Sequence, residues 1–263
     1  MLHPLRLVAS VLVALCFWLP GPSWADPPPA SGTPAVPDRG AGIDPETVAR
    51  FQERNGPVFQ GWAQPRAVIV FTGELDGYIE PCGCTGKENQ KGGLSRRENF
   101  LQALQSVGWP VVAVDLGGQV RRFGRQSEVK FQSISDGLRT MNYAGVGLGP
   151  DDLRLPAEEL VAAVAAVGDQ PTPFLSANVG LLGLVNNITP RQRIVEVGGL
   201  RIGITAVLGD KQAAQVRNDA IEVIPAAEAL AGPAAAFTKA GCTHQVLLSW
   251  ADPEETKALA ARY

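Results

Sequence analysis

The stretch of sequence that decides the fold is FTGELDGYIEPCGCTGKENQKGGLSRRENF, residues 71–100. Residues 67–71, AVIVF, form an apolar and β-branched run, which predicts a short buried strand. The stretch closes on Gly92-Gly93, after which a helical pattern begins. A long polar loop between a buried strand and a helix is usually functional or disordered. The density of glycine, cysteine and paired charge in this loop favours a function.

The alternation of strand and helix continues along the rest of the chain. Further strands are predicted at 110–114, 144–148, 173–177, 194–197, 200–207 and 245–250, and helices at 94–107, 128–141, 156–167, 225–239 and 253–262. The two strands on either side of Gly198-Gly199 have the pattern of a hairpin. Near-continuous apolar strands that alternate with helices predict an α/β protein whose strands are covered on both faces.

The amino terminus has the composition of a secretory signal. Arg6 supplies a positive charge, residues 7–19 are apolar apart from Ser10, and Ser23-Trp24-Ala25 offers a cleavage site. The apolar run is short for a membrane span, which needs ~20 apolar residues, so a retained anchor is only the second hypothesis. Residues 1–25 are therefore predicted to be a signal peptide. The chain is expected to be exported, periplasmic or extracellular, without a membrane span after cleavage.

A linker and a single domain are predicted to follow the signal. Residues 26–43 are rich in Pro, Gly, Ala and Ser, a composition that cannot bury enough apolar surface to order itself. Asp44-Pro45-Glu46 has the residues of a helix start, with an N-cap acid, then proline, then an acid in the first turn. The folded domain is therefore predicted to span residues 44–263.

Charge and cysteine content limit the possible functions. Cleavage after residue 25 would remove one of the 23 basic residues, Arg6, and none of the 26 acidic residues. A mildly acidic chain has no electrostatic footprint for nucleic acid or for an anionic membrane. Export would place the remaining cysteines, Cys82, Cys84 and Cys242, in an oxidising compartment. Their odd number means that at least one thiol is free, intermolecular or metal-bound.

The Cys82-Gly83-Cys84 motif has three interpretations. A disulfide, either within the pair or from one of them to Cys242, is favoured by the oxidising compartment. Redox or soft-metal chemistry is the second interpretation, although the spacing is narrower than that of ordinary metal sites and of haem-attachment or thioredoxin motifs. A free thiol is the third.

Acidic side chains follow several of the predicted strands, where α/β sheets place their sites. Glu74 and Asp76 follow the first strand, Asp115 follows the next, and Asp151 and Asp152 follow the third. Their oxygen ligands suit a hard cation such as Ca²⁺ or Mg²⁺. The alternative interpretation is that they are solvated loop acids and helix N-caps, because Asp151 and Asp152 precede a helix.

A candidate anion site lies at the end of the opening loop. Gly92-Gly93 precedes Arg96 and Arg97, so helix N–H groups and guanidinium groups could converge on a phosphate. The alternative is a turn and a helix cap, with the arginines solvated or paired to a neighbouring acid. Residues 119–125 add positive charge at the same edge, which favours an anionic ligand.

Taken in order, these motifs resemble the calcineurin-like metallophosphoesterases, and within them the secreted 5′-nucleotidases. The resemblance runs from Val68 to the last residue. Its motifs are Glu74-Leu75-Asp76-Gly77, Gly92-Gly93 with Arg96-Arg97, Asp115-Leu116-Gly117-Gly118, Gly149-Pro150-Asp151-Asp152, Ser176-Ala177-Asn178-Val179, and residues 198–204 and 246–250. It implies a layered α/β/β/α sandwich, incomplete at the carboxyl terminus because the family's last Gly-His-x-His motif is missing. It also implies that Asn178 joins the two arginines in anion binding.

The same correspondence implies that the family's metal ligands have been lost. The family clamps phosphate with two metal ions held by imidazole and carboxylate ligands. Here Asp76 stands at the first histidine position, Gly118 at the bridging aspartate, Pro150 at the asparagine ligand, Asp151 at the catalytic histidine and Trp250 at a later histidine. The sequence contains only 2 histidines, one of them within the predicted signal. A family-type dinuclear site cannot be built from these residues.

The first functional hypothesis is therefore a pseudo-phosphoesterase that acts as a binding or scaffolding module with a protein partner and no cofactor. Proteins similar to this one in the motif Glu80-Pro81-Cys82-Gly83-Cys84 can be joined to multihaem cytochrome regions, which implies an electron-transfer assembly with such a cytochrome. The second hypothesis is a phosphoester hydrolase with a carboxylate-only divalent metal site. Its metal ligands would be Glu74, Asp76, Asp151 and Asp152. A third hypothesis is that this is the front part of a longer protein.

Overall fold

The computed structural model describes residues 49, 53, 61–81, 92–122, 124–184 and 188–263. All of them belong to one compact unit, Pro34–Tyr263. The predicted signal peptide, the linker, the helix start at 44–46 and the cysteine pair at 82 and 84 lie outside the described residues, and these predictions remain untested. Within the described residues, no helix is both long enough and apolar enough to cross a membrane.

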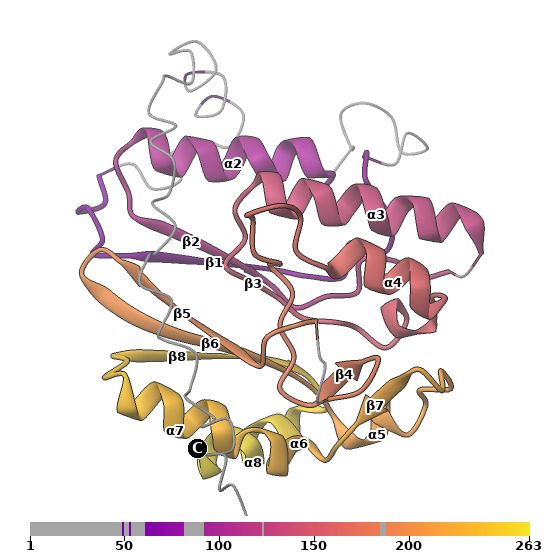
Figure 1. Cartoon of the computed structure of the whole chain (residues 1–263). Coiled ribbons are helices and arrows are strands. Elements are labelled where there is room, and N and C mark those ends of the chain that lie inside the picture. The colour runs from indigo at the N-terminus through magenta and orange to yellow at the C-terminus, as the bar shows by residue number, and fades with distance from the viewer. Residues whose placement is uncertain (1–48, 50–52, 54–60, 82–91, 123, 185–187) are drawn as a thin grey trace, which may run out of the picture. The chain divides into compact units, whose positions relative to one another are not determined.

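The first half of the described chain forms a parallel sheet with helices on one face. Its strands, in spatial order, are β1 (Val68–Thr72), β2 (Val111–Asp115) and β3 (Gly145–Val146). The covering helices are α2 (Leu94–Ser106), α3 (Arg125–Thr140) and α4 (Ala157–Val164) (Figure 1). Because side chains alternate along a strand, Ala113 packs toward these helices, whereas Val112 and Val114 point to the opposite face.

The second half forms another sheet with its own helical layer. Its strands are β5 (Gln192–Val197), β6 (Leu200–Leu208) and β8 (His244–Trp250). The β5–β6 hairpin is antiparallel and β8 joins β6 in parallel. The helices α6 (Ala226–Ala229), α7 (Ala231–Lys239) and α8 (Pro253–Arg262) cover its outer face (Figure 1). The short elements of the described chain are the 3₁₀ helix η3 (Asp152–Arg154), the helix α5 (Asp210–Ala213), and the antiparallel pair of strands β4 (Val179–Leu181) and β7 (Ile221–Val223).

The two sheets pack face to face through an apolar core. Val112 and Val114 of β2 join Ile202 and Ile204 of β6 and Leu248 of β8 in one buried cluster. The opposite face of β6 packs closely on its helical layer, because a Cβ added at Gly203 would clash with the Phe237 ring of α7. The layers thus follow the order helix, sheet, sheet, helix. This confirms the α/β/β/α sandwich that the resemblance implied.

Three predicted elements differ from those in the structure. Residues 173–177 form no strand, and Phe174 alone makes a bridge to Val146. The strand predicted at 144–148 is shorter and spans Gly145–Val146; at Gly147 the chain lies against the loop after β2, where an added Cβ would clash with the Leu116 carbonyl oxygen. The helix predicted at 225–239 is divided at Leu230 into α6 and α7. The hairpin and the helix at 253–262 are confirmed.

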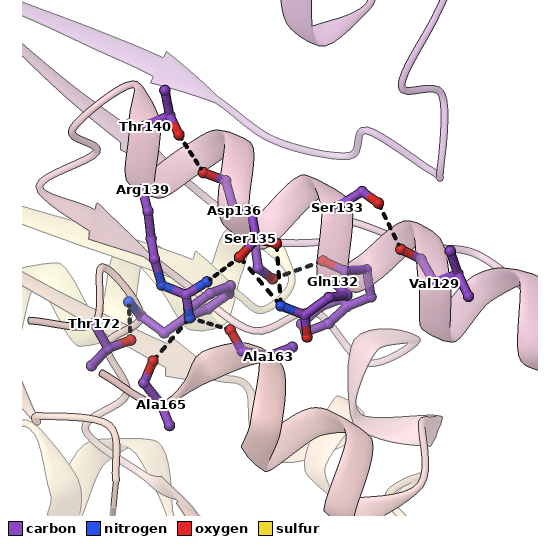
Figure 2. A network of polar contacts seen from close by, with 12 residues as sticks. Val129, Gln132, Ser133, Ser135, Asp136, Arg139, Thr140, Ala163, Ala165 and Thr172 are labelled. Atoms are coloured by element: carbon purple, nitrogen blue, oxygen red, sulfur yellow. Dashed lines mark hydrogen bonds and ion pairs between the residues drawn. The ribbon is translucent and has the colours of Figure 1, made fainter. Parts of the chain in front are cut away.

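A buried arginine joins two of the helices above the first sheet. Arg139 of α3, whose side chain is 6% exposed, donates from Nη2 to the carbonyl oxygens of Ala163 and Ala165 (Figure 2). Its Nη1 lies 2.9 Å from the carboxylate of Asp136. The guanidinium thus satisfies carbonyl groups that the end of α4 leaves without intrahelical partners.

Candidate functional site

The candidate site lies where the carboxyl ends of β1, β2, β3 and β8 meet. The loop after β1 runs beside the loop after β2, since the N–H groups of Glu74, Asp76 and Gly77 donate to residues 117, 118 and 119 at 2.8, 3.1 and 2.7 Å. Glu74 and Asp76 have φ values of 49° and 55°. Such left-handed conformations are uncommon for residues other than glycine and often mark functional segments.

Asp115, at the end of β2, is fully buried and its carboxylate has four donors. Its Oδ1 accepts from the Gly117 N–H at 2.8 Å and from Gln119 Nε2 at 2.6 Å. Its Oδ2 accepts from Arg97 Nη1 at 2.8 Å and from the Thr72 hydroxyl at 2.5 Å. A carboxylate offers about four lone-pair positions, so this one has none left for a metal ion.

Asp152 is also fully buried, and all four of its donors are backbone N–H groups. Its Oδ1 accepts from Gln119 and Val120 at 2.8 and 3.1 Å. Its Oδ2 accepts from Gly118 and Gly149, both at 2.8 Å. The carboxylate therefore links the loop after β2 to the loop after β3 through hydrogen bonds.

Opposing forces act on the ionisation of Asp152. Burial raises the pKa of this carboxyl group to about 7, while the four N–H donors act to lower its pKa. With every lone pair accepting a hydrogen bond, Asp152 is not available as the metal ligand expected from the sequence. Nor does it cap the helix that follows it, as the alternative interpretation expected.

The remaining predicted ligands lie nearer the surface, and two of them, Asp76 and Asp151, lie near arginines. Asp76 Oδ2 is 3.9 Å from Arg121 Nη1, and Asp151 Oδ1 is 3.2 Å from Arg154 Nη1. Glu74 is exposed. Within the described ranges, no group of three or more His, Cys, Asp or Glu side chains is arranged to hold a metal ion.

The Trp250 side chain fills the space between these loops. Its Nε1–H donates to the Leu116 carbonyl oxygen at 2.7 Å. A Cβ added at Gly118 would lie 2.9 Å from its Cζ2 atom, and one added at Gly149 would lie 3.1 Å from its Cε2 atom. The first of these positions is also within 3.3 Å of the Glu74 Cα atom. An indole ring thus lies among the motifs to which the resemblance assigns metal ligands.

The predicted anion-binding residues are not gathered at one place. Arg97 is paired with the buried Asp115 carboxylate at 2.8 Å and is 13% exposed, whereas Arg96 is exposed on the first turn of α2. Asn178 is buried between β6 and β7, where its Nδ2 donates to the carbonyl oxygens of Leu208 and Ile224. Its Oδ1 accepts from the Leu208 N–H. In place of the expected anion contact, Asn178 binds backbone groups.

Two residues of this region were not singled out by the sequence. Tyr143 is buried, and its hydroxyl lies 3.1 Å from Thr72 Oγ1, next to Asp115. Burial raises the pKa of the Tyr143 hydroxyl. Gln119 was seen only as part of a basic segment, yet its side chain is wholly buried. Its position after the Gly-Gly pair that follows β2 is the one sequence signal that could have identified it.

The fold is that of the calcineurin-like phosphoesterases and 5′-nucleotidases. The 5′-nucleotidase precursor from Thermus thermophilus matches with a TM-score of 0.60 and 18% identity, over 73% of this chain and 38% of that one. The NAD nucleotidase of Haemophilus influenzae matches with a TM-score of 0.57 and 20% identity, over 73% and 35%. The sulfate thiohydrolase SoxB of Thermus thermophilus matches with a TM-score of 0.59 and 14% identity, over 76% and 47%.

These similarities concern the fold. The chain spans less than half the length of each of these three solved chains. No protein-family model matches the sequence. No curated protein matches it either.

Proposed function

We propose that this chain is a non-hydrolytic member of the phosphoesterase fold, an exported module that binds or scaffolds a protein partner. The observation that carries the proposal is the packing of the Trp250 indole against Gly118 and Gly149. A dinuclear centre needs carboxylate and imidazole ligands directed into a shared space. Here an apolar ring takes up space among the corresponding motifs, and the two buried carboxylates nearby have no lone pair to give.

The proposal includes a location and a partner. The composition of residues 1–25 supports export. The resemblance of the Glu-Pro-Cys-Gly-Cys motif at 80–84 to that of proteins joined to multihaem cytochrome regions supports an electron-transfer assembly with such a cytochrome. Affinity purification of the tagged chain from its source organism tests this part. The expected result is a co-eluting haem protein with a Soret absorption band, and a complex without haem would contradict it.

A second candidate function is a phosphoester hydrolase that uses a single divalent ion. The observation in its favour is the strained backbone of Glu74 and Asp76, at φ 49° and 55°. These two carboxylates would hold the ion, and the exposed Arg96 would bind the substrate phosphate. Asp115 and Asp152 could not contribute, because backbone and side-chain donors occupy all of their lone pairs.

A hydrolysis assay with matched variants separates the two functions. The full chain, its Glu74→Ala/Asp76→Ala variant and a Glu158→Ala/Asp169→Ala control would be given p-nitrophenyl phosphate and bis(p-nitrophenyl) phosphate with Mg²⁺ or Mn²⁺. Glu158 and Asp169 are exposed acids outside the site, so their loss matches the charge change. Equal, background rates in all three proteins are expected. Turnover by the wild type and the control that the first variant abolishes would establish the hydrolase.

A further inference from the structure

The packing around Trp250 has the features of a binding slot for a flat ring. The slot is bounded by Gly118 and Gly149, where any added Cβ would come within 2.9 and 3.1 Å of the indole. At one point of its rim the Leu116 carbonyl oxygen accepts the indole Nε1–H at 2.7 Å. Glycine lets a planar ring approach the backbone closely, and the carbonyl oxygen requires a donor at one position of that ring.

The walls of this slot are held in place by groups other than the ring. Asp152 accepts hydrogen bonds from the N–H groups of Gly118 and Gly149, both at 2.8 Å. Asp115 holds the neighbouring Gly117 N–H at 2.8 Å. Gly147 packs directly on the Leu116 carbonyl group, with no room for a Cβ between them. Since these contacts do not involve the indole, the slot should keep its shape when the ring is removed.

We propose that this slot is a binding site for planar heteroaromatic rings with one N–H donor, and that Trp250 is its built-in occupant. The side chain fills the slot as an intramolecular ligand, joining the end of β8 to the loops after β2 and β3. A ring supplied from solution can take the same place when the tryptophan side chain is absent, because the partly buried gap is already shaped for a ring and its one unsatisfied acceptor requires a matching donor. The ligand class is thus indole-like, in place of a metal ion or a phosphate.

Chemical rescue tests the proposal directly. In the full chain carrying Trp250→Gly, free indole should raise the thermal midpoint by about 3 °C at ten times its dissociation constant. Benzofuran has the same shape but presents an oxygen where indole has its N–H, so it should bind at least about tenfold more weakly. The control is Trp62→Gly, because Trp62 is 67% exposed and the substitution therefore removes a ring that lies at the surface. Indole should not stabilise this control.

The outcomes decide the proposal even when the variant folds poorly. If Trp250→Gly does not fold alone, indole added during refolding should recover folded protein, and benzofuran should not. A Trp250→Phe variant, which keeps a ring but removes the donor to Leu116, should fold with a lower midpoint than the wild type and gain nothing from indole. No stabilisation or recovery of Trp250→Gly by indole would overturn the proposal. Equal binding of benzofuran would overturn the role of the N–H donor.

Discussion

Each oxygen of the Asp152 carboxylate accepts two backbone hydrogen bonds, and each oxygen of Asp115 accepts two from a backbone N–H or a side chain. Burial of a charged group is unfavourable unless its hydrogen-bonding capacity is met, and here it is met by neighbouring loops. These two carboxylates therefore hold neighbouring segments of the chain together through hydrogen bonds. Acids in the sequence of a phosphoesterase fold need not be ligands.

Replacement of Asp152 with Asn should strongly destabilise the fold. An asparagine turns one acceptor oxygen into an NH₂ group, which would then face two backbone N–H donors. We expect a loss of about 3 kcal/mol in the free energy of unfolding, measured by urea denaturation. Asp151→Asn is the matched control, because Asp151 is partly exposed and its change should stay within about 0.5 kcal/mol. Equal changes in the free energy of unfolding for the two substitutions would contradict the role of Asp152 in holding the two loops together.

Substitution of Gly118 tests the contact between this residue and the indole of Trp250. Gly118 and Gly92 have nearly the same φ, 73° and 74°. An added Cβ at Gly118 meets Trp250, whereas one at Gly92 meets no atom of the described residues within 4 Å. Alanine at Gly92 should cost about 1 kcal/mol for the left-handed backbone alone. Alanine at Gly118 should cost about 3 kcal/mol, since overpacking adds to the strain. Similar losses for both variants, by the same denaturation assay, would show that the ring does not occupy this space.

Among the elements, those with a clear period were predictable from sequence. The apolar runs of β1, β2, β6 and β8 and the hairpin turn predicted the strands themselves, and the resemblance supplied the two sheets and the order of the layers. The elements that were missed are short: β4, β7 and α5 have too few residues for a period to show.

The candidate site was less predictable than the fold. The sequence placed the acids at strand ends, which the structure bears out, but it could not show what each carboxylate binds. Three of the four partners of Asp152 are backbone N–H groups in the loop after β2, up to 34 residues away, and backbone donors leave no mark in a sequence. The sequence shows a small residue, Gly118, and a large one, Trp250, at two positions where the resemblance expects metal ligands. Only the packing of the two sheets shows that these residues are in contact.

The contact that Arg139 makes between α3 and the end of α4 should stabilise the fold. Its guanidinium reaches two carbonyl oxygens at the end of α4 and the carboxylate of Asp136 at once (Figure 2). A lysine has one ammonium group and cannot reproduce this fork. Arg139→Lys should lower the free energy of unfolding by about 2 kcal/mol, whereas Arg154→Lys, at a side chain 58% exposed, should change it by less than about 0.5 kcal/mol. A chemical denaturation series measures both, and no difference between them would refute the role of Arg139.

At the scale of the whole molecule, the arrangement of the sheets bears on the cysteine pairing. Residues 81 and 92 flank the undescribed loop at the start of α2, where the Leu94 N–H donates to the Ile79 carbonyl oxygen at 2.9 Å. Trp250, the last residue of β8, lies at this same end of the sheets. Cys242 lies before the other end of β8, a strand of 7 residues and so about 23 Å long. A disulfide requires Cα atoms within about 7 Å of each other.

Cys242, which is a free thiol within the described residues, should therefore remain unpaired in the oxidised protein. Burial raises the pKa of the Cys242 thiol, so its alkylation in the native state should be slower than in denaturant. Alkylation without reductant, followed by peptide mass spectrometry, should place a label on Cys242. A peptide that links Cys242 to Cys82 or Cys84 would contradict this assignment.

The metal content of the protein tests most directly whether this phosphoesterase fold forms without a catalytic metal centre. The chain would be purified without chelator and without a histidine tag, and its divalent metals counted by mass spectrometry alongside Glu74→Ala/Asp76→Ala and the Glu158→Ala/Asp169→Ala control. We predict a folded protein with far less than one equivalent of any divalent metal, the same in all three. A full equivalent in the wild type and the control, lost in the Glu74/Asp76 variant, would contradict the claim and establish a metal site.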